Sequence, residues 1–176
     1  PQRFYVHEKI FEEFSALVAN YAAALTVGNG LDSETRLGPL INKTQQQHVL
    51  QIIEQAKEEK NNIITGGTAQ HPGNFVLPTV IEVTNKQSEF IHKEIFGPVM
   101  PLIPFSTIEE VITLANQTPY GLSAYIWTNN INHAIYLSEA LEFGMVGINE
   151  WAPHATEAPF GGWKQSGIGH ESGSEG

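Results

Sequence analysis

The sequence predicts an α/β fold, with an open, largely parallel twisted sheet flanked by helices. Two amphipathic helical patterns occupy the first third of the chain, and strand-like segments alternate with helical ones in the second half. Such alternation is typical of βαβ units, because parallel neighbouring strands need a crossover connection. The 176 residues, 41% of them hydrophobic, are enough for one ordinary core. We therefore expect a single domain over residues 1–176.

The first third contains two predicted helices. Residues 8–25 and 44–59 each carry apolar side chains three and four positions apart, which places those side chains on one helix face. These apolar positions are Phe11, Phe14, Val18, Tyr21, Ala22 and Leu25 in the first helix and Val49, Ile52, Ile53 and Ala56 in the second. The first helix is expected to end near Gly28-Asn29-Gly30, because glycine and asparagine accept the left-handed conformation that stops helices.

The middle of the chain predicts strands. Ile63–Thr65 forms a short strand closed by two glycines, and residues 75–83 are extended. Pro78 interrupts that second stretch, which favours a sheet edge or a loop crossing, since proline cannot donate a ladder hydrogen bond. A further strand is expected over residues 99–105.

Helix and strand alternate in the second half. Thr107 is expected to start a helix, and Glu110 three residues later fits a capping box. A strand over residues 123–128, a helix over 131–143 and a strand over 145–149 follow. Beyond them the periodicity disappears and glycine becomes dense.

Composition excludes several classes of function. The formal net charge is −10 with no compensating basic cluster, so binding to nucleic-acid phosphates is unfavourable. No apolar run reaches membrane-spanning length and no secretory signal is visible, so we expect a cytoplasmic protein without membrane partners. The absence of cysteine excludes a disulfide framework, a thiolate zinc site and cysteine catalysis in this chain. No two of the seven histidines have the spacing of a helical metal site, and no metal is expected.

The segment Lys93–Pro98 differs from an ordinary connector. Glu94 and Phe96 precede Gly97-Pro98, which fixes the backbone direction at a strand entrance. A carboxylate there can accept two hydrogen bonds from a ribose diol, and an aromatic ring can lie against a planar cofactor ring. Taken without further context, the residues are more simply explained as a solvated glutamate and a core phenylalanine at a turn.

The glycine-rich segment from Asn149 to Gly169 is the second candidate. Its glycines allow a ligand to approach the backbone closely, and Lys164 adds one positive charge. It matches neither a phosphate-binding P-loop nor a dinucleotide fingerprint. A flexible surface loop is the alternative interpretation. Three large aromatic residues in the segment, Trp151, Phe160 and Trp163, favour an apolar pocket or interface instead.

The ordered combination of motifs resembles the aldehyde dehydrogenase superfamily over essentially all 176 residues. The matching stretches are Glu94–Pro98 (EIFGP), Pro119–Ala124 (PYGLSA), Gly144–Asn149 (GMVGIN) and Pro159–Gly167 (PFGGWKQSG), with shorter agreement at Pro1–Val6, Val27–Asn29, Leu37–Leu40 and Pro78–Val80. The resemblance implies the catalytic-domain fold of that family, with NAD or NADP as cofactor.

The resemblance also implies roles for individual residues. Glu94 corresponds to the family's glutamate that binds the nicotinamide ribose, and Phe96 to its phenylalanine on the nicotinamide side. Gln45 resembles a ribose-contacting glutamine, within a looser motif. His48 stands where some members have a ribose-contacting lysine, so that contact differs in this chain.

On the substrate side, Phe160 is similar to the aromatic residue that lines the family's aldehyde channel. Trp151 and His154 fall in its variable, substrate-facing loop. Succinate-semialdehyde dehydrogenases have similar stretches, but they usually carry serine where His154 stands. Trp151 is instead reminiscent of enzymes that accept bulky or cationic aldehydes, so both substrate classes stay open.

The resemblance implies that the chain is part of a catalytic domain truncated at both ends. In the family, the catalytic cysteine lies just before the counterpart of Pro1, and the general-base glutamate and the cofactor domain lie further upstream. The cysteine forms a thiohemiacetal with the aldehyde and then a thioester, which water hydrolyses to the acid. We therefore expect a fragment that is inactive alone, with no catalytic residue of its own, and a homo-oligomer when intact. A non-catalytic binding or assembly module that reuses this domain is the alternative.

Overall fold

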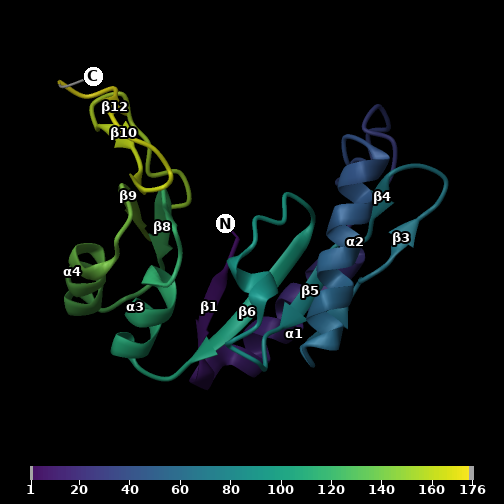
Figure 1. Ribbon diagram of the computed structural model, residues 1–176, viewed down its shortest axis with the longest axis horizontal. Helices are drawn as coiled ribbons and strands as arrows, with labels where there is room; N and C mark the ends of the chain where they lie inside the picture. The colour runs from purple at the N-terminus through teal and green to yellow at the C-terminus, as the bar shows by residue number, and fades with distance from the viewer. Residues whose placement is uncertain (1, 175–176) are drawn as a thin grey trace. The chain divides into compact units, whose positions relative to one another are not determined.

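The structure is a computed structural model that describes residues 2–174. The chain divides into two compact units, Pro1–Phe105 and Ser106–Gly176, which we call unit 1 and unit 2 (Figure 1). Pro1 and residues 175–176, the ends of the predicted domain, lie outside the described residues. That the whole chain is a single domain stays a prediction.

Unit 1 is built around a four-stranded sheet in the order β1-β6-β5-β2. Strand β6 runs parallel to both β1 and β5, and β2 runs antiparallel to β5. The elements are β1 (Phe4–His7), α1 (Glu8–Ala24), α2 (Lys43–Glu58), β2 (Asn62–Thr65), β3 (Ala69–Gln70), β4 (Phe75–Val76), β5 (Thr79–Glu82), the 3-10 helix η1 (Glu89–His92) and β6 (Val99–Phe105). This mostly parallel sheet flanked by helices confirms the predicted fold class.

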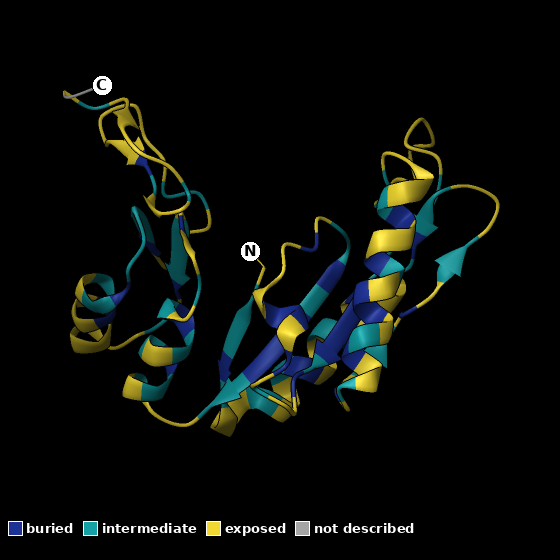
Figure 2. Ribbon diagram, in the orientation of Figure 1, coloured by how far each residue is buried: buried dark blue, intermediate teal, exposed yellow. Residues whose placement is uncertain are grey.

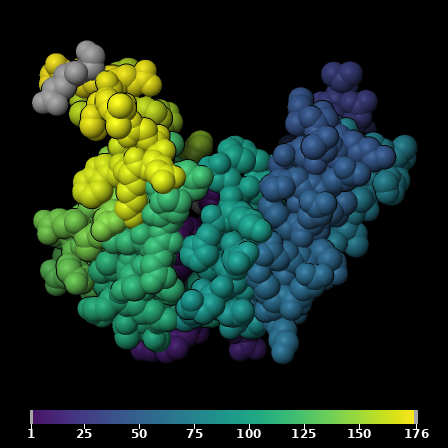
Figure 3. Space-filling view, in the orientation of Figure 1, coloured from purple at the N-terminus to yellow at the C-terminus, as the bar shows by residue number. Residues whose placement is uncertain are grey.

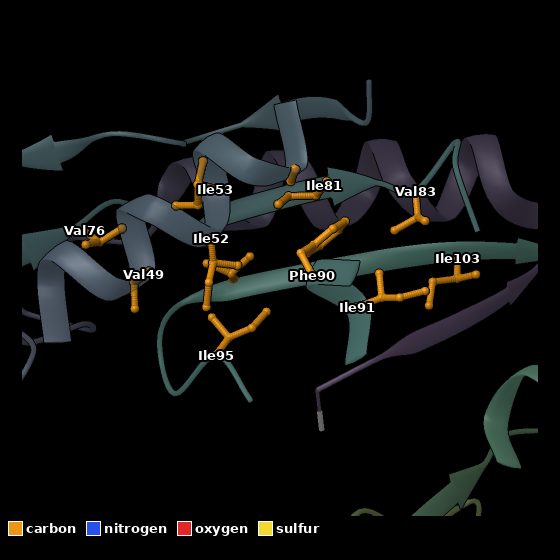
Figure 4. Close-up of a cluster of buried hydrophobic side chains, with 12 residues drawn as sticks. Val49, Ile52, Ile53, Val76, Ile81, Val83, Phe90, Ile91, Ile95 and Ile103 are labelled. Carbon is orange, nitrogen blue, oxygen red and sulfur yellow. The ribbon is translucent and has the colours of Figure 1, made fainter. Parts of the chain in front are cut away.

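The two helices of unit 1 cover opposite faces of the sheet. Side chains alternate along each strand, so that Val80 packs with α1 while its neighbour Ile81 packs with α2. The cluster on the α2 face is shown in Figure 4, and burial is concentrated in these strands and on the inner side of α2 (Figure 2). Each fully buried aliphatic side chain contributes about 1.5–3 kcal/mol, so these two clusters hold the layers together.

The predicted helices agree with α1 and α2, apart from small differences at their ends. Helix α1 ends at Ala24, where the N–H of Leu25 returns to the carbonyl of Ala22, four residues before Gly28. Helix α2 begins after Asn42, whose side-chain oxygen accepts the backbone N–H of Gln45 at 2.8 Å.

Of the two alternatives for Pro78, the sheet edge was wrong, because β5 is an interior strand between β6 and β2. The loop crossing agrees with the structure, since Pro78 lies in the loop between β4 and β5, which belong to different sheets. Proline lies immediately before this strand rather than in it. The first ladder donor is Thr79, whose backbone N–H bonds to the carbonyl of Pro98 at 2.8 Å. Pro78 is therefore not required to donate a ladder hydrogen bond.

Unit 2 combines two helices with short strands. Its elements are α3 (Ile108–Asn116), β7 (Tyr120–Gly121), β8 (Ser123–Ile126), α4 (Ile131–Ala140), β9 (Met145–Ile148), β10 (Phe160–Gly161), β11 (Trp163–Lys164) and β12 (His170–Glu171). Strands β8 and β9 pair in parallel, whereas β7 pairs with β11 and β10 with β12 in antiparallel fashion. The predicted βαβ alternation is thus present in β8, α4 and β9.

The start of α3 uses a variation of the predicted capping box. The hydroxyl of Thr107 accepts the backbone N–H of Glu110 at 3.2 Å, as expected for an N-cap. The carboxylate of Glu110 accepts both the backbone N–H and the hydroxyl of Ser106, at 2.8 and 2.9 Å. The reciprocal bond therefore reaches one residue further back than the usual motif.

Candidate functional site: the Glu94–Phe96 segment and the glycine-rich segment

The predicted cofactor segment connects η1 to β6 in unit 1. Ile95 is 1% exposed and packs into the α2-side cluster, where Figure 4 shows it near Ile52. Glu94 and Phe96 on either side of it are exposed, Phe96 to 67%. The interpretation of Phe96 as a core residue was therefore wrong: the core residue of this motif is Ile95, and the two flanking side chains are presented to solvent.

Phe96 has a backbone conformation that is unusual for a bulky residue. Its φ is 45°, in the left-handed region that a Cβ disfavours. The side-chain amide of Gln45 donates to the carbonyls of both Ile95 and Phe96, each at 3.1 Å. The first turn of α2 is thus bonded directly to the backbone at the strained position.

Three further contacts fix the same segment. The backbone N–H of Ile95 donates to Oε1 of Gln2 at 3.2 Å. The ammonium of Lys93 donates to Oε1 of Gln55 on α2 at 2.7 Å. A Cβ on Gly97 would lie 2.6 Å from Cγ2 of Val49. Only glycine at position 97 therefore allows the loop to lie this close to α2. The sequence analysis singled out Lys93 with its segment, but it did not identify Gln2 or Gln55 as contacts. No local pattern marks these two residues, because their partners lie 93 and 38 positions away.

His48 lies one helical turn after Gln45 on α2 and is exposed. Residues three apart on a helix share a face, so His48 and Gln45 lie on the same side of α2. The outer side of this helix forms open surface in the space-filling view (Figure 3). The structure therefore brings Gln45 to Phe96 through hydrogen bonds, and places His48 beside Gln45 on the helix.

A shallow apolar pocket of about 390 Å³ lies next to Gly97 and Pro98 in unit 1. Its other lining residues are Leu37, Gly38, Pro39, Leu40 and Val76. None of these side chains carries a titratable or nucleophilic group, so the pocket can offer shape and apolar contact but no proton transfer.

The start of the glycine-rich segment in unit 2 is held by Asn149. Its side chain accepts the backbone N–H of Thr128 and donates to the carbonyl of the same residue, both at 2.9 Å. Asn149 has a φ of 53°, which asparagine tolerates better than most residues. After this turn, Trp151 is 78% exposed and His154 is exposed. The structure thus presents both predicted substrate-loop side chains to solvent.

The rest of the glycine-rich segment is bonded to the body of unit 2. Lys164 donates to the carbonyls of Asn116 and Thr118 at the end of α3, at 2.8 and 3.2 Å, and forms an ion pair with Glu142. These bonds satisfy carbonyls that a helix C-terminus leaves free. The hydroxyl of Ser166 accepts the backbone N–H of Gly121 at 2.9 Å. The interpretation as a flexible surface loop does not fit these contacts, and the charge of Lys164 has a structural use.

Phe160 lies in β10, which pairs with β12, and the residue is 37% exposed. The neighbouring backbone is tightly packed, because a Cβ on Gly144 would collide with the carbonyl of Gly161. Phe160 is therefore a partly exposed aromatic residue next to a closely packed stretch of backbone.

The chain carries side chains that can bind a cofactor or a substrate. It offers carboxylates, amides, imidazoles and aromatic rings, and it contains no cysteine. Among residues 2–174 there is no group of three or more histidines or carboxylates that could hold a metal ion. No helix in that range is both long and apolar enough to cross a membrane.

Comparison with known proteins identifies the family. The family model described as "Aldehyde dehydrogenase family" matches residues 1–176, the whole chain. The chain belongs to the aldehyde dehydrogenase family. Rice mitochondrial succinate-semialdehyde dehydrogenase is 44% identical over 170 residues, which are 96% of this chain and 32% of the relative. Human retinaldehyde dehydrogenase 3 is 41% identical over 172 residues, 97% of this chain and 34% of the relative.

Solved aldehyde dehydrogenase structures have the same fold. The NAD+ complex of the Bacillus cereus aldehyde dehydrogenase matches with a TM-score of 0.93 and 41% identity, covering 99% of this chain and 36% of that one. This aldehyde dehydrogenase chain therefore spans about a third of the length of the relatives that it matches.

Proposed function

We propose that this chain is part of an enzyme that oxidises an aldehyde to a carboxylic acid with NAD or NADP. The observation that carries the proposal is the match of the aldehyde dehydrogenase family over every residue of the chain. The fold of both units and the presentation of Glu94 and Phe96 support it. In this proposal the chain supplies part of the cofactor-binding and substrate-binding surface.

The residues in unit 1 fit a nicotinamide cofactor. The exposed carboxylate of Glu94 can accept hydrogen bonds from both hydroxyls of a ribose, and the exposed ring of Phe96 offers an apolar face to a planar heterocycle. Gln45 and His48 are proposed to contact the ribose from α2, with Oε1 of Gln45 as an acceptor. When bound, NAD or NADP accepts a hydride from the substrate.

On the substrate side we propose Phe160, Trp151 and His154. All three carry rings that are at least partly exposed. Relatives named for succinate semialdehyde and for retinaldehyde are 44% and 41% identical, so similarity alone does not choose between a small anionic and a large apolar aldehyde. A homo-oligomer and a cytoplasmic location stay predictions.

The nucleophile must come from outside these 176 residues, because thioester chemistry needs a thiolate and the chain has no cysteine. From the family resemblance we propose that this cysteine lies just before the counterpart of Pro1. The proposed role of this chain is consequently to hold cofactor and substrate beside a group that it does not carry.

The test uses the full-length product of the gene that encodes these residues. We expect it to reduce NAD or NADP in the presence of an aldehyde, and we expect Glu94→Gln to raise the KM for the cofactor about tenfold. Loss of a charge-assisted hydrogen bond at the lower end of the usual range, about 1.5 kcal/mol, has this effect, because about 1.4 kcal/mol corresponds to a factor of ten. Gln47→Glu, an exposed change on α2, serves as a control. Unchanged cofactor kinetics for Glu94→Gln would remove Glu94 from the site.

A further inference from the structure

The peptide groups around Ile95 are hydrogen-bonded to two glutamine side chains, of which one accepts and the other donates. Gln2 acts as an acceptor, because its Oε1 receives the backbone N–H of Ile95 at 3.2 Å. Gln45 acts as a donor, because its Nε2 bonds to the carbonyls of Ile95 and Phe96, each at 3.1 Å. We call these two side chains the glutamine pair.

The hydrogen bonds of the glutamine pair are made next to the strained backbone of Phe96. A φ of 45° is disfavoured for phenylalanine and persists only when its surroundings hold it. Phe96 is 67% exposed, so packing of its own side chain does not hold the backbone in this conformation. The buried side chain of Ile95 anchors the segment on one side, and the hydrogen bonds of the glutamine pair fix the orientation of the peptides that flank it.

Gln45 is itself fixed before it reaches the segment. Its backbone N–H is bonded to the N-cap side chain of Asn42 at 2.8 Å. The adjacent Gln46 is 5% exposed and donates to the carbonyls of Gly73 and Phe75, which ties the same turn of α2 to a second loop. The first turn of α2 is therefore a rigid support for the bonds to residues 95 and 96.

We propose that Gln2 and Gln45 are positioning residues, which orient Glu94 and Phe96 toward the cofactor by fixing the backbone at residues 95 and 96. The inference rests on the proposed function. It assigns Gln45 a role through the backbone in addition to any ribose contact, and it gives Gln2 a role that the sequence did not suggest. Because Gln2 adjoins the segment where the nucleophile is expected, it also links that segment to the cofactor motif.

Because Gln2 accepts and Gln45 donates, the same substitution, glutamine to glutamate, should have different effects at the two positions. Gln2→Glu keeps an acceptor oxygen for the N–H of Ile95. Gln45→Glu removes both donors and brings a carboxylate against two carbonyl oxygens, which repel it. Gln2→Leu removes the acceptor at position 2. Gln47→Glu introduces the same charge at an exposed position of α2, two residues from Gln45, and is the matched control.

The experiment compares these variants in the full-length gene product. The dissociation constant for NAD or NADP is measured by titration calorimetry, and steady-state kinetics separate the KM for cofactor from the KM for aldehyde. We expect Gln45→Glu, which loses two hydrogen bonds and gains a repulsive carboxylate, to weaken cofactor binding by about tenfold or more. Gln2→Leu loses one neutral hydrogen bond of about 1 kcal/mol and should weaken it by about fivefold. Little change is expected in the KM for aldehyde. Gln2→Glu and Gln47→Glu are expected to stay within about twofold.

A second measurement follows the hydrogen bonds without activity. Exchange of the Ile95 backbone amide should be slow in the unchanged protein and in Gln2→Glu, and faster in Gln2→Leu. If Gln45→Glu does not fold, the two Gln2 variants decide the matter by themselves.

The possible failures are distinguishable. Equal cofactor affinity in Gln2→Leu and Gln2→Glu, or no difference between Gln45→Glu and Gln47→Glu, would overturn the inference and leave the proposed function intact. An unchanged full-length protein that binds neither NAD nor NADP would overturn the proposed function and the inference together.

Discussion

Tyr5, in the middle of β1, is a residue whose protonation depends on the fold. Its side chain packs against the α2-side cluster, and the guanidinium carbon of Arg3 lies 6.0 Å from the centre of its ring. Burial raises the pKa of the Tyr5 hydroxyl above its usual value of 10.0, and the charge and hydrogen bond of Arg3 act in the opposite direction. Burial is the larger influence.

This raised pKa predicts a loss of stability in alkali. Above about pH 10 the unfolded chain releases the Tyr5 proton while the folded chain still holds it, so the unfolded state binds fewer protons and stability falls as pH rises. We expect Tyr5→Phe to make the free energy of unfolding fall less steeply as the pH rises above about 10. Urea denaturation of both proteins at several pH values measures this, and identical slopes would contradict the expected ionisation behaviour.

At the residue scale, the sequence predicted which residues are candidates for the site, but not which of their side chains are exposed to solvent. The Glu94–Pro98 motif was sufficient to single out Glu94 and Phe96. The exposure of Phe96 was not predictable, because it depends on Gln45 and Gln2, which lie 51 and 94 positions earlier in the sequence. Lys164 shows the same limit: its charge suggested a ligand, and its partners at the end of α3 are more than 40 positions away.

At the scale of elements, the contact of Gly97 with α2 controls how closely the cofactor segment approaches the helix. A Cβ at Gly97 would lie 2.6 Å from Cγ2 and 3.1 Å from Cγ1 of Val49, which is fully buried. The segment and the helix must separate to accept any side chain larger than hydrogen.

We expect Gly97→Ala to destabilise unit 1 by about 1–3 kcal/mol through overpacking. Gly38→Ala is the control, since nothing lies within 4 Å of the added Cβ there, and it should be nearly neutral. Adding Val49→Ala to Gly97→Ala should cost less than the sum of the two single changes, because the second change makes space for the first. A double-mutant cycle of unfolding free energies, measured by denaturant titration, tests this. Additive changes in the free energy of unfolding would show that the two residues do not compete for space.

Elements with long periodic patterns were predicted well. Both α1 and α2 follow from the spacing of their apolar residues, and the bounds of β6 agree with the predicted strand. Strand β1 was missed because it has four residues and passes directly into α1, with His7 serving as both the last strand residue and the helix N-cap. No glycine or proline separates the two elements, so the boundary has no local signal.

At the scale of the whole molecule, the sequence established the family but not the division into units. Ordered motifs from Glu94 to Gly167 are specific to aldehyde dehydrogenases when taken together, and the match over the complete chain agrees with them. The boundary between the units follows Phe105, and α3 begins at Ile108. The connection is therefore too short to show a linker-like composition. Compact units are defined by contacts between residues that are far apart in the sequence, and local sequence patterns do not predict these contacts.

The central claim is that these residues supply binding surface to a reaction whose nucleophile lies elsewhere. The most direct measurement compares the purified 176-residue chain with the full-length gene product, by following aldehyde-dependent formation of NADH or NADPH over several aldehydes. We expect turnover by the full-length product and none above background by the chain alone, because thioester chemistry needs a thiolate that the chain lacks. Turnover by the isolated chain would contradict the claim.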